Sequence, residues 1–129
     1  MTAGYSGTPL VRKLGIKPDA RVLVLGAPAG FDPGAPYHRR PGADPYDVVL
    51  LFCPDRATLE RRFDAAAARH ATAGMLWVCW PKRSSGVVTD LSDAVVRDWG
   101  LTHGRVDVKV CAIDATWSAL KFVVRLADR

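Results

Sequence analysis

Two short, almost continuous apolar runs limit what this chain can fold into more than any other feature. After one charged residue each, Arg21–Leu25 continues as VLVL and Asp47–Cys53 continues as VVLLFC. Strands that are buried on both faces of a parallel sheet have this composition, because neither side of the strand meets water. We therefore predict parallel strands at these two segments and, by the same pattern, at Met75–Trp80.

Signals for helices fall before and between these runs. Helices are predicted from a Thr8 cap to Gly15, from Pro54-Asp55 to Gly74, and from a cap at Thr89 or Asp90 to Gly100. Apolar positions recur every three or four residues in the two longer helices: Leu59, Phe63, Ala66, Ala67 and His70 in one, and Leu91, Val95 and Trp99 in the other.

The last two predicted strands have a different pattern. Apolar and polar residues alternate in Val106–Ala112 and in Trp117–Leu126, as in strands with one exposed face. The four residues between them are too few for a helical crossover, so these strands should pair antiparallel. Polar residues on their exposed face predict cross-strand ion pairs, with Asp107 and Lys109 facing Lys121 and Arg125.

The order of these elements predicts the fold class. Strand, loop, strand, helix, strand, helix and two strands give a three-layer, Rossmann-like α/β sheet of about five strands. The sheet should be mostly parallel, with the last strand antiparallel and helices on both faces. A long irregular connection, Gly26–Tyr46, is rich in proline and glycine, and a loop of this length in a small domain is often functional.

Composition fits one globular domain spanning residues 1–129, with 49% hydrophobic and 24% charged residues. The net charge of +5 is spread among acidic residues, which permits phosphate-rich partners without indicating them. No apolar run is long enough to cross a bilayer, and three cysteines without a CxxC pair indicate thiols in a reducing compartment. We therefore predict a cytoplasmic protein without a membrane partner. Tryptophans spread over both layers disfavour nucleic-acid binding.

Leu14–Gly30 resembles the first motif of class I S-adenosylmethionine-dependent methyltransferases, in which a strand that carries an acidic residue runs into a GxGxG turn. Here Val24 stands in place of the acid and Pro28 in place of the middle glycine, while Gly26 and Gly30 remain. The resemblance implies that two strands carrying much of the cofactor site are missing. It further implies a sheet order of first, second, third, fifth, fourth, with no cofactor and a degenerate cofactor loop.

Over nearly its whole length, the chain looks like a bacterial family of small domains of unknown function. The family opens with YSGTPL, here Tyr5–Leu10, and carries a WPK loop, here Trp80–Lys82. No activity, ligand or partner comes with this resemblance.

The WPK loop supplies the candidate ligand site. It leaves the carboxyl end of a parallel strand, where open α/β sheets bind ligands, and leads toward a helix N-terminus. The long connection leaves the same edge, so its cations could join those of the loop in one basic rim for a phosphate or carboxylate of a small molecule. An exposed, solvated turn remains the alternative for the loop. The predicted ligand-binding residues are Arg39, Arg40, Lys82, Arg83, Ser84 and Ser85.

Two functions remain open from the sequence. The first is a non-catalytic binding or interaction module, since no nucleophile and base occur in a recognisable context and the histidines and cysteines lack metal-site spacing. The alternative is an enzyme with a reduced methyltransferase-like or nucleotide-binding site that takes an anionic substrate at the basic rim. A homodimer is also predicted, because the first strand lies at a sheet edge.

Overall fold

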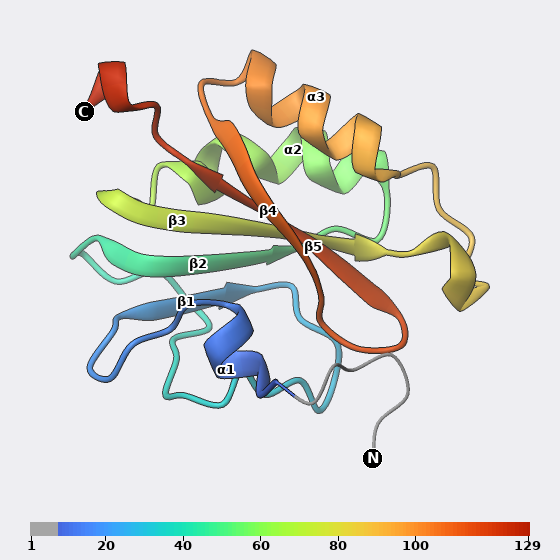
Figure 1. The fold of residues 1–129 in the computed structure, drawn as a ribbon, viewed down its shortest axis with the longest axis horizontal. Coiled ribbons are helices and arrows are strands. Elements are labelled where there is room, and N and C mark those ends of the chain that lie inside the picture. The colour runs from blue at the N-terminus through green and yellow to red at the C-terminus, as the bar shows by residue number, and fades with distance from the viewer. Residues whose placement is uncertain (1–7) are drawn as a thin grey trace.

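A computed structural model describes residues 8–129, so the first three residues of the Tyr5–Leu10 motif lie outside the described residues. Five strands form one mixed sheet in the order β1-β2-β3-β5-β4, as expected from the sequence (Figure 1). The first three strands are parallel, and β5 runs antiparallel to both of its neighbours. The strands are β1 (Val22–Leu25), β2 (Tyr46–Phe52), β3 (His70–Pro81), β4 (Val106–Ala112) and β5 (Trp117–Val123).

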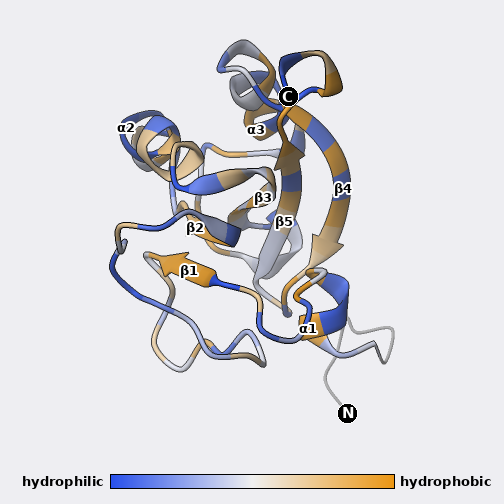
Figure 2. Cartoon of the chain, turned by 90° about the vertical axis from the view of Figure 1, so that its left-hand side faces the viewer, coloured by the Kyte–Doolittle hydropathy of each residue, from blue (hydrophilic) through white to orange (hydrophobic). Residues whose placement is uncertain are grey.

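The two faces of the sheet are covered differently (Figure 2). Helices α2 (Arg56–Ala67) and α3 (Asp93–Thr102) both pack on one face, α2 against β2 and β3, and α3 against β4 and β5. On the other face lie α1 (Leu10–Lys13) and parts of the irregular connection after β1. The indole nitrogen of Trp77 donates to the carbonyl oxygen of Leu14 at 3.0 Å, which ties the end of α1 to the sheet. Helical cover on this face is therefore limited to one short helix.

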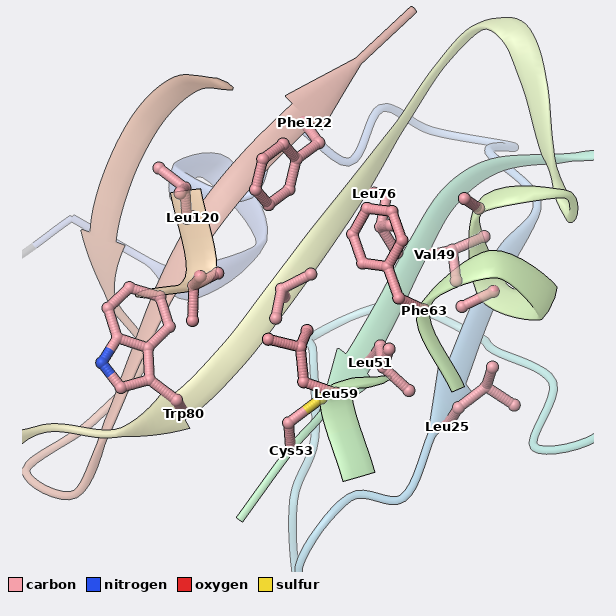
Figure 3. Packing of buried hydrophobic residues seen from close by; sticks show 14 of the residues in the cluster. Leu25, Val49, Leu51, Cys53, Leu59, Phe63, Leu76, Trp80, Leu120 and Phe122 are labelled. Carbon is pink, nitrogen blue, oxygen red and sulfur yellow. The ribbon is translucent and has the colours of Figure 1, made fainter. Parts of the chain in front are cut away.

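Burial on both faces accounts for the continuous apolar runs. Alternate residues of β1 and β2 enter opposite clusters, so Leu25 and Leu51 face the longer helices while Val24 and Leu50 face α1. Figure 3 shows the helix-side cluster, in which Leu59 and Phe63 of α2 pack over the strands. Each fully buried side chain of this size contributes about 1.5–3 kcal/mol. The strand predictions at the first two runs are confirmed to within one residue at each end, whereas β3 begins at His70, five residues before its predicted start at Met75.

The predicted helix from Pro54 to Gly74 is too long, because α2 ends at Ala67 and β3 begins at His70. His70 continues the apolar stripe of the helix in sequence, but its ring is held elsewhere. Its Nδ1 lies 2.7 Å from the Ala71 carbonyl oxygen, and its Nε2 accepts from Arg105 Nε at 3.0 Å. Burial is the main cause that lowers the pKa of His70, and the Arg105 charge acts in the same direction.

The predicted limits of α3 were also wrong. Ser92 is the N-cap, since its hydroxyl accepts from the Val95 amide at 3.2 Å. The Thr89 hydroxyl instead donates to the Pro54 carbonyl oxygen just before α2, and the Asp90 carboxylate accepts from the amide of Arg56, the first residue of α2. Gly100 does not end the helix but lies inside it, directly against the ring of Phe122.

The predicted limits differ at both ends of the chain as well. Helix α1 begins one residue later than predicted, with Pro9 as its N-cap, and Gly15 follows it with a φ of 71°. Strand β5 ends at Val123, three residues before its predicted end.

The predicted cross-strand ion pairs on β4 and β5 are wrong, because the register shifts by one residue between Asp107 and Lys109. This bulge turns the two side chains to opposite faces of the sheet. Asp107 faces α3 and accepts from Arg97 Nε at 2.9 Å, whereas Lys109 stands directly opposite Lys121. The guanidinium of Arg125 lies 3.5 Å from the carbonyl oxygen of Leu101.

The free edge of β1 is partly paired by the connection that follows it. His38 forms a parallel bridge to Leu23: its amide donates to the Val22 carbonyl oxygen at 2.8 Å, and its carbonyl oxygen accepts from the Val24 amide at 2.9 Å. The open edge from which a dimer was predicted is therefore covered over part of its length. Across residues 8–129, none of the helices combines the length and the apolar character needed to span a bilayer.

Candidate functional site

The turn after β1, residues 26–30, has the backbone geometry that its glycines predict. Gly26 and Gly30 adopt φ values of 72° and 81°, in the left-handed region that side chains with a Cβ disfavour. A Cβ on Gly26 would lie 3.2 Å from the Phe52 carbonyl oxygen and 3.3 Å from Arg62 Nη1. The Phe31 amide donates to the Pro28 carbonyl oxygen at 3.2 Å and closes the turn. We refer to residues 26–30 as the first turn.

A cavity of 230 Å³ opens beside the first turn, and the long connection brings Arg39 to it. The placement follows from the His38 bridge, because the residue after a backbone paired to Val22 and Val24 must lie near the end of β1. The Arg39 guanidinium also lies 6.0 Å from the ring centroid of Tyr37. The cavity is lined by Val24, Gly26, Ala27, Pro28, Ala29, Gly30, Phe31, Tyr37 and Arg39.

Tyr46 anchors the far end of the same connection. Its buried hydroxyl lies 2.5 Å from His38 Nδ1 and accepts from the Gly42 amide at 2.8 Å. The Arg21 guanidinium stacks 4.5 Å from the Tyr46 ring centroid and donates through Nε to the Pro45 carbonyl oxygen at 3.1 Å. These contacts fix the backbone on both sides of Arg39, whose side chain is exposed.

The WPK loop folds into a tight turn containing the 3-10 helix η1 (Arg83–Ser85). The hydroxyl of Ser85 donates to the Lys82 carbonyl oxygen at 2.7 Å and accepts from the Val87 amide at 3.1 Å. This hydroxyl therefore stabilises the turn, whereas Arg83 and Ser84 are exposed and Lys82 is half-buried.

The predicted site residues thus fall into two groups. Arg39 shares its cavity with Gly26, Pro28 and Gly30 of the degenerate cofactor loop. None of Lys82, Arg83, Ser84 and Ser85 lines that cavity, and neither does Arg40, which is exposed. A single rim that joins Arg39 and Arg40 to the WPK loop remains a prediction.

The N-terminus of α2, at the same edge of the sheet, is occupied by the chain's own side chains. Asp55 Oδ1 accepts from the amide of Thr58 at 2.8 Å and from its hydroxyl at 2.7 Å, and these bonds lower the pKa of Asp55. Asp90 Oδ1 accepts from the Arg56 amide at 2.8 Å. An external anion would have to displace these carboxylates, so α2 offers no vacant dipole site.

The cysteines are buried or half-buried thiols. Cys53 and Cys79 are buried on opposite faces of the sheet, as their apolar surroundings predicted, and Cys111 is half-buried. Burial raises the pKa of Cys53 to about 12, and burial also raises the pKa values of Cys79 and Cys111. These thiols therefore stay protonated at neutral pH and are poor nucleophiles. Within residues 8–129, no three histidine, cysteine or acidic side chains gather as metal ligands would.

Sequence reasoning missed one basic feature. Arg61 and Arg62 of α2, and Arg69 just after it, line a groove of 490 Å³ together with Leu25 and Pro41. In the sequence these arginines look like the solvated side of an amphipathic helix. The available signal was the spacing of Arg61 and Arg69, which would lie on one line along the predicted helix to Gly74, although α2 itself ends at Ala67.

Comparison with models of known protein families and with curated proteins gave no match to this chain. Function is therefore inferred from the geometry of the first turn and of the surrounding cations.

Proposed function

We propose that this protein is a non-catalytic binding module that holds a small anion, such as a phosphate or carboxylate group, at the first turn. The observation that carries the proposal is the position of Arg39 beside Gly26 and Gly30 at the carboxyl end of β1. Ligands of open α/β sheets bind outside this end of the strands. A guanidinium with exposed turn amides is a chemically suitable partner for an oxyanion.

The scaffold in this proposal is a reduced, Rossmann-like three-layer fold. Supporting it are the parallel β2-α2-β3 unit, the antiparallel β5, and a short helix before β1 that packs on the opposite face from α2. The resemblance of Leu14–Gly30 to the first methyltransferase motif agrees with this assignment.

The lining of the cavity favours a small anion over a nucleoside cofactor. Val24 lines it where the related motif has an acid, and Pro28 brings no amide hydrogen to the turn. Its 230 Å³ is below the range of about 300–1,000 Å³ that is usual for pockets of larger organic ligands. Among the described lining residues, Arg39 is the one with a charge.

The competing enzyme function is disfavoured because the described residues that line this site include no cysteine, serine, threonine, histidine or acidic side chain. A cysteine thiol could act as a nucleophile elsewhere in a protein of this kind. Cys53, however, is buried with a pKa raised to about 12 and does not line the cavity. Binding of an anion at the first turn, without a catalysed reaction, is therefore the simpler function for these residues.

The test is a titration with inorganic phosphate, followed by the amide resonances of Gly26 and Gly30 and by the melting temperature. The matched variants are Arg39→Gln and Arg40→Gln, since only the first of these neighbouring arginines lines the cavity. We expect saturable shifts at both glycines and a rise in melting temperature for the wild type and for Arg40→Gln, and neither effect for Arg39→Gln.

Two results would overturn the proposal. One is an Arg39→Gln variant that responds to phosphate as the wild type does. The other is stabilisation by S-adenosylmethionine, because a cofactor site would then exist despite Val24 and Pro28.

A further inference from the structure

A second basic site lies on the other face of the sheet from the Arg39 cavity. It is the groove between α2 and the end of β1, and we call it the arginine groove. Leu25 belongs to the helix-side cluster, whereas Val24 of the Arg39 cavity belongs to the opposite one. The groove has a volume of 490 Å³ and is lined by Leu25, Pro41, Arg61, Arg62, Ala65, Ala66 and Arg69.

The helix sets the spacing of its charges. Arg61 and Ala65 are i, i+4 positions of α2, and Arg69 follows the helix two residues after its last residue, Ala67, so the groove runs along the last two turns of α2, which rise about 9 Å from Arg61 to Ala67. Ala65 between the two arginines has a side chain too short to fill the space. Arg62 points toward the first turn, since its Nη1 lies 3.3 Å from the position of a Cβ on Gly26. The groove therefore has arginine side chains at both ends and small side chains between them, which leave the middle of the groove open.

These charges are poorly neutralised by the protein itself. Within residues 8–129, the side chains of Arg62 and Arg69 make no hydrogen bond or ion pair, and Arg61 has the exposed Asp55 as a charged neighbour. The acidic residues of α2 interact with other cations: Glu60 forms an ion pair with Arg56 at 2.8 Å, and Asp64 interacts electrostatically with Arg105. Three like charges along one groove repel each other, and a bound anion would remove that repulsion.

We propose that the arginine groove binds a small organic molecule with an anionic group, of the phosphate type, at each end. Guanidinium groups bind phosphate through paired, directional hydrogen bonds. The floor of Leu25, Ala65 and Ala66 is apolar and suits an uncharged middle section, and the volume lies within the usual range for such ligands. No aromatic side chain lines the groove in the described chain, so it offers no stacking platform for the bases of a nucleic acid.

Isothermal titration with hexane-1,6-diol bisphosphate and with hexyl monophosphate tests this proposal. The wild type should bind the bisphosphate at least tenfold more tightly than the monophosphate, because only the bisphosphate reaches both ends. Arg69→Gln should weaken bisphosphate binding about tenfold and leave monophosphate binding nearly unchanged. Ala65→Leu, which fills the floor without changing charge, should weaken both.

Arg12→Gln is the control for loss of one exposed positive charge, since Arg12 lies on α1 away from the groove. Arg39→Gln separates this site from the first turn, and it should leave bisphosphate binding intact even where it abolishes the response to phosphate. Thermal unfolding of each variant confirms that it is folded.

The proposal is overturned if the bisphosphate binds no more tightly than the monophosphate, or if Arg69→Gln binds it as the wild type does. It is also overturned if Arg12→Gln weakens binding as much as Arg69→Gln, because attraction to overall charge would then be the cause.

Discussion

Gly100 is the position at which one added methyl group should affect stability most clearly. A Cβ there would lie 2.0 Å from Cε1 of Phe122, 2.4 Å from its Cζ and 2.7 Å from its Cδ1. The Phe122 ring is fully buried and packs edge-to-face with Phe63, with centroids 5.8 Å apart. The ring cannot turn aside without disturbing this second aromatic side chain, so α3 and β5 would have to separate.

The expected cost follows from two opposing effects of Gly100→Ala. Replacing a glycine inside a helix ordinarily gains about 1 kcal/mol. Overpacking a core costs about 1–3 kcal/mol, and this case belongs at the upper end because carbon atoms in contact are normally about 3.5–4.0 Å apart. The net result should be a loss of about 2 kcal/mol in the free energy of unfolding.

Urea denaturation of five proteins measures this effect. The wild type, Gly100→Ala, Phe122→Leu and the double variant form a double-mutant cycle. In the Phe122→Leu background, Gly100→Ala should lower the free energy of unfolding much less, because Cε1 and Cζ of the ring are gone. Ala94→Gly, at an exposed position of α3, measures the helix propensity on its own. A Gly100→Ala variant at least as stable as the wild type, or one equally costly in both backgrounds, would refute the reasoning.

Two further predictions concern ionisable groups. The pKa of His70 is lowered on folding, so below the ordinary histidine pKa near 6.5 the native state binds fewer protons than the unfolded state. The contribution of His70 to the free energy of unfolding is therefore fully present above that pH and is lost as the solution is acidified. Melting temperatures at pH 7.5 and 5.5 should therefore differ more for the wild type than for His70→Gln, and an equal loss would contradict the burial argument. Lys109 faces Lys121 directly across β4 and β5, so Lys109→Glu should raise the free energy of unfolding by about 0.2–1 kcal/mol. The gain should shrink in high salt and should exceed that of Lys17→Glu, an exposed control with the same change of charge; equal gains would mean that only net charge matters.

The strands could be predicted because their signal is local. VLVL and VVLLFC are apolar on both faces, and the structure buries both faces. The helix limits failed where tertiary contacts decide. His70 fits a helical stripe but lies in β3, where its ring accepts from Arg105, and Gly100 looks like a helix end although it provides room for Phe122.

The candidate site was only partly predictable for a related reason. The left-handed glycines of the first turn could be read from the sequence, but the approach of Arg39 depends on backbone hydrogen bonds of His38, which any residue except proline could make. The bulge between Asp107 and Lys109 could not be predicted either, because one extra residue in a strand does not change the residue types that the strand contains. The arginine groove could not be predicted either, because one side of it is formed by Pro41, which the long connection brings across from α2.

The His38 bridge has a consequence for how this protein could diversify. Because its two hydrogen bonds to β1 fix the far end of the segment, residues 27–37 form a surface loop closed at both ends by the sheet. Doubling the length of such a loop costs only about 0.6 kcal/mol in closure entropy. Insertions in the exposed stretch Ala27–Gly30 would reshape the mouth of the cavity while the bridge keeps Arg39 in place, and they would spare Phe31, Pro33 and Ala35, which are buried or pack on the α1-side cluster. Ligand preference can thus evolve in this stretch without a change in the core.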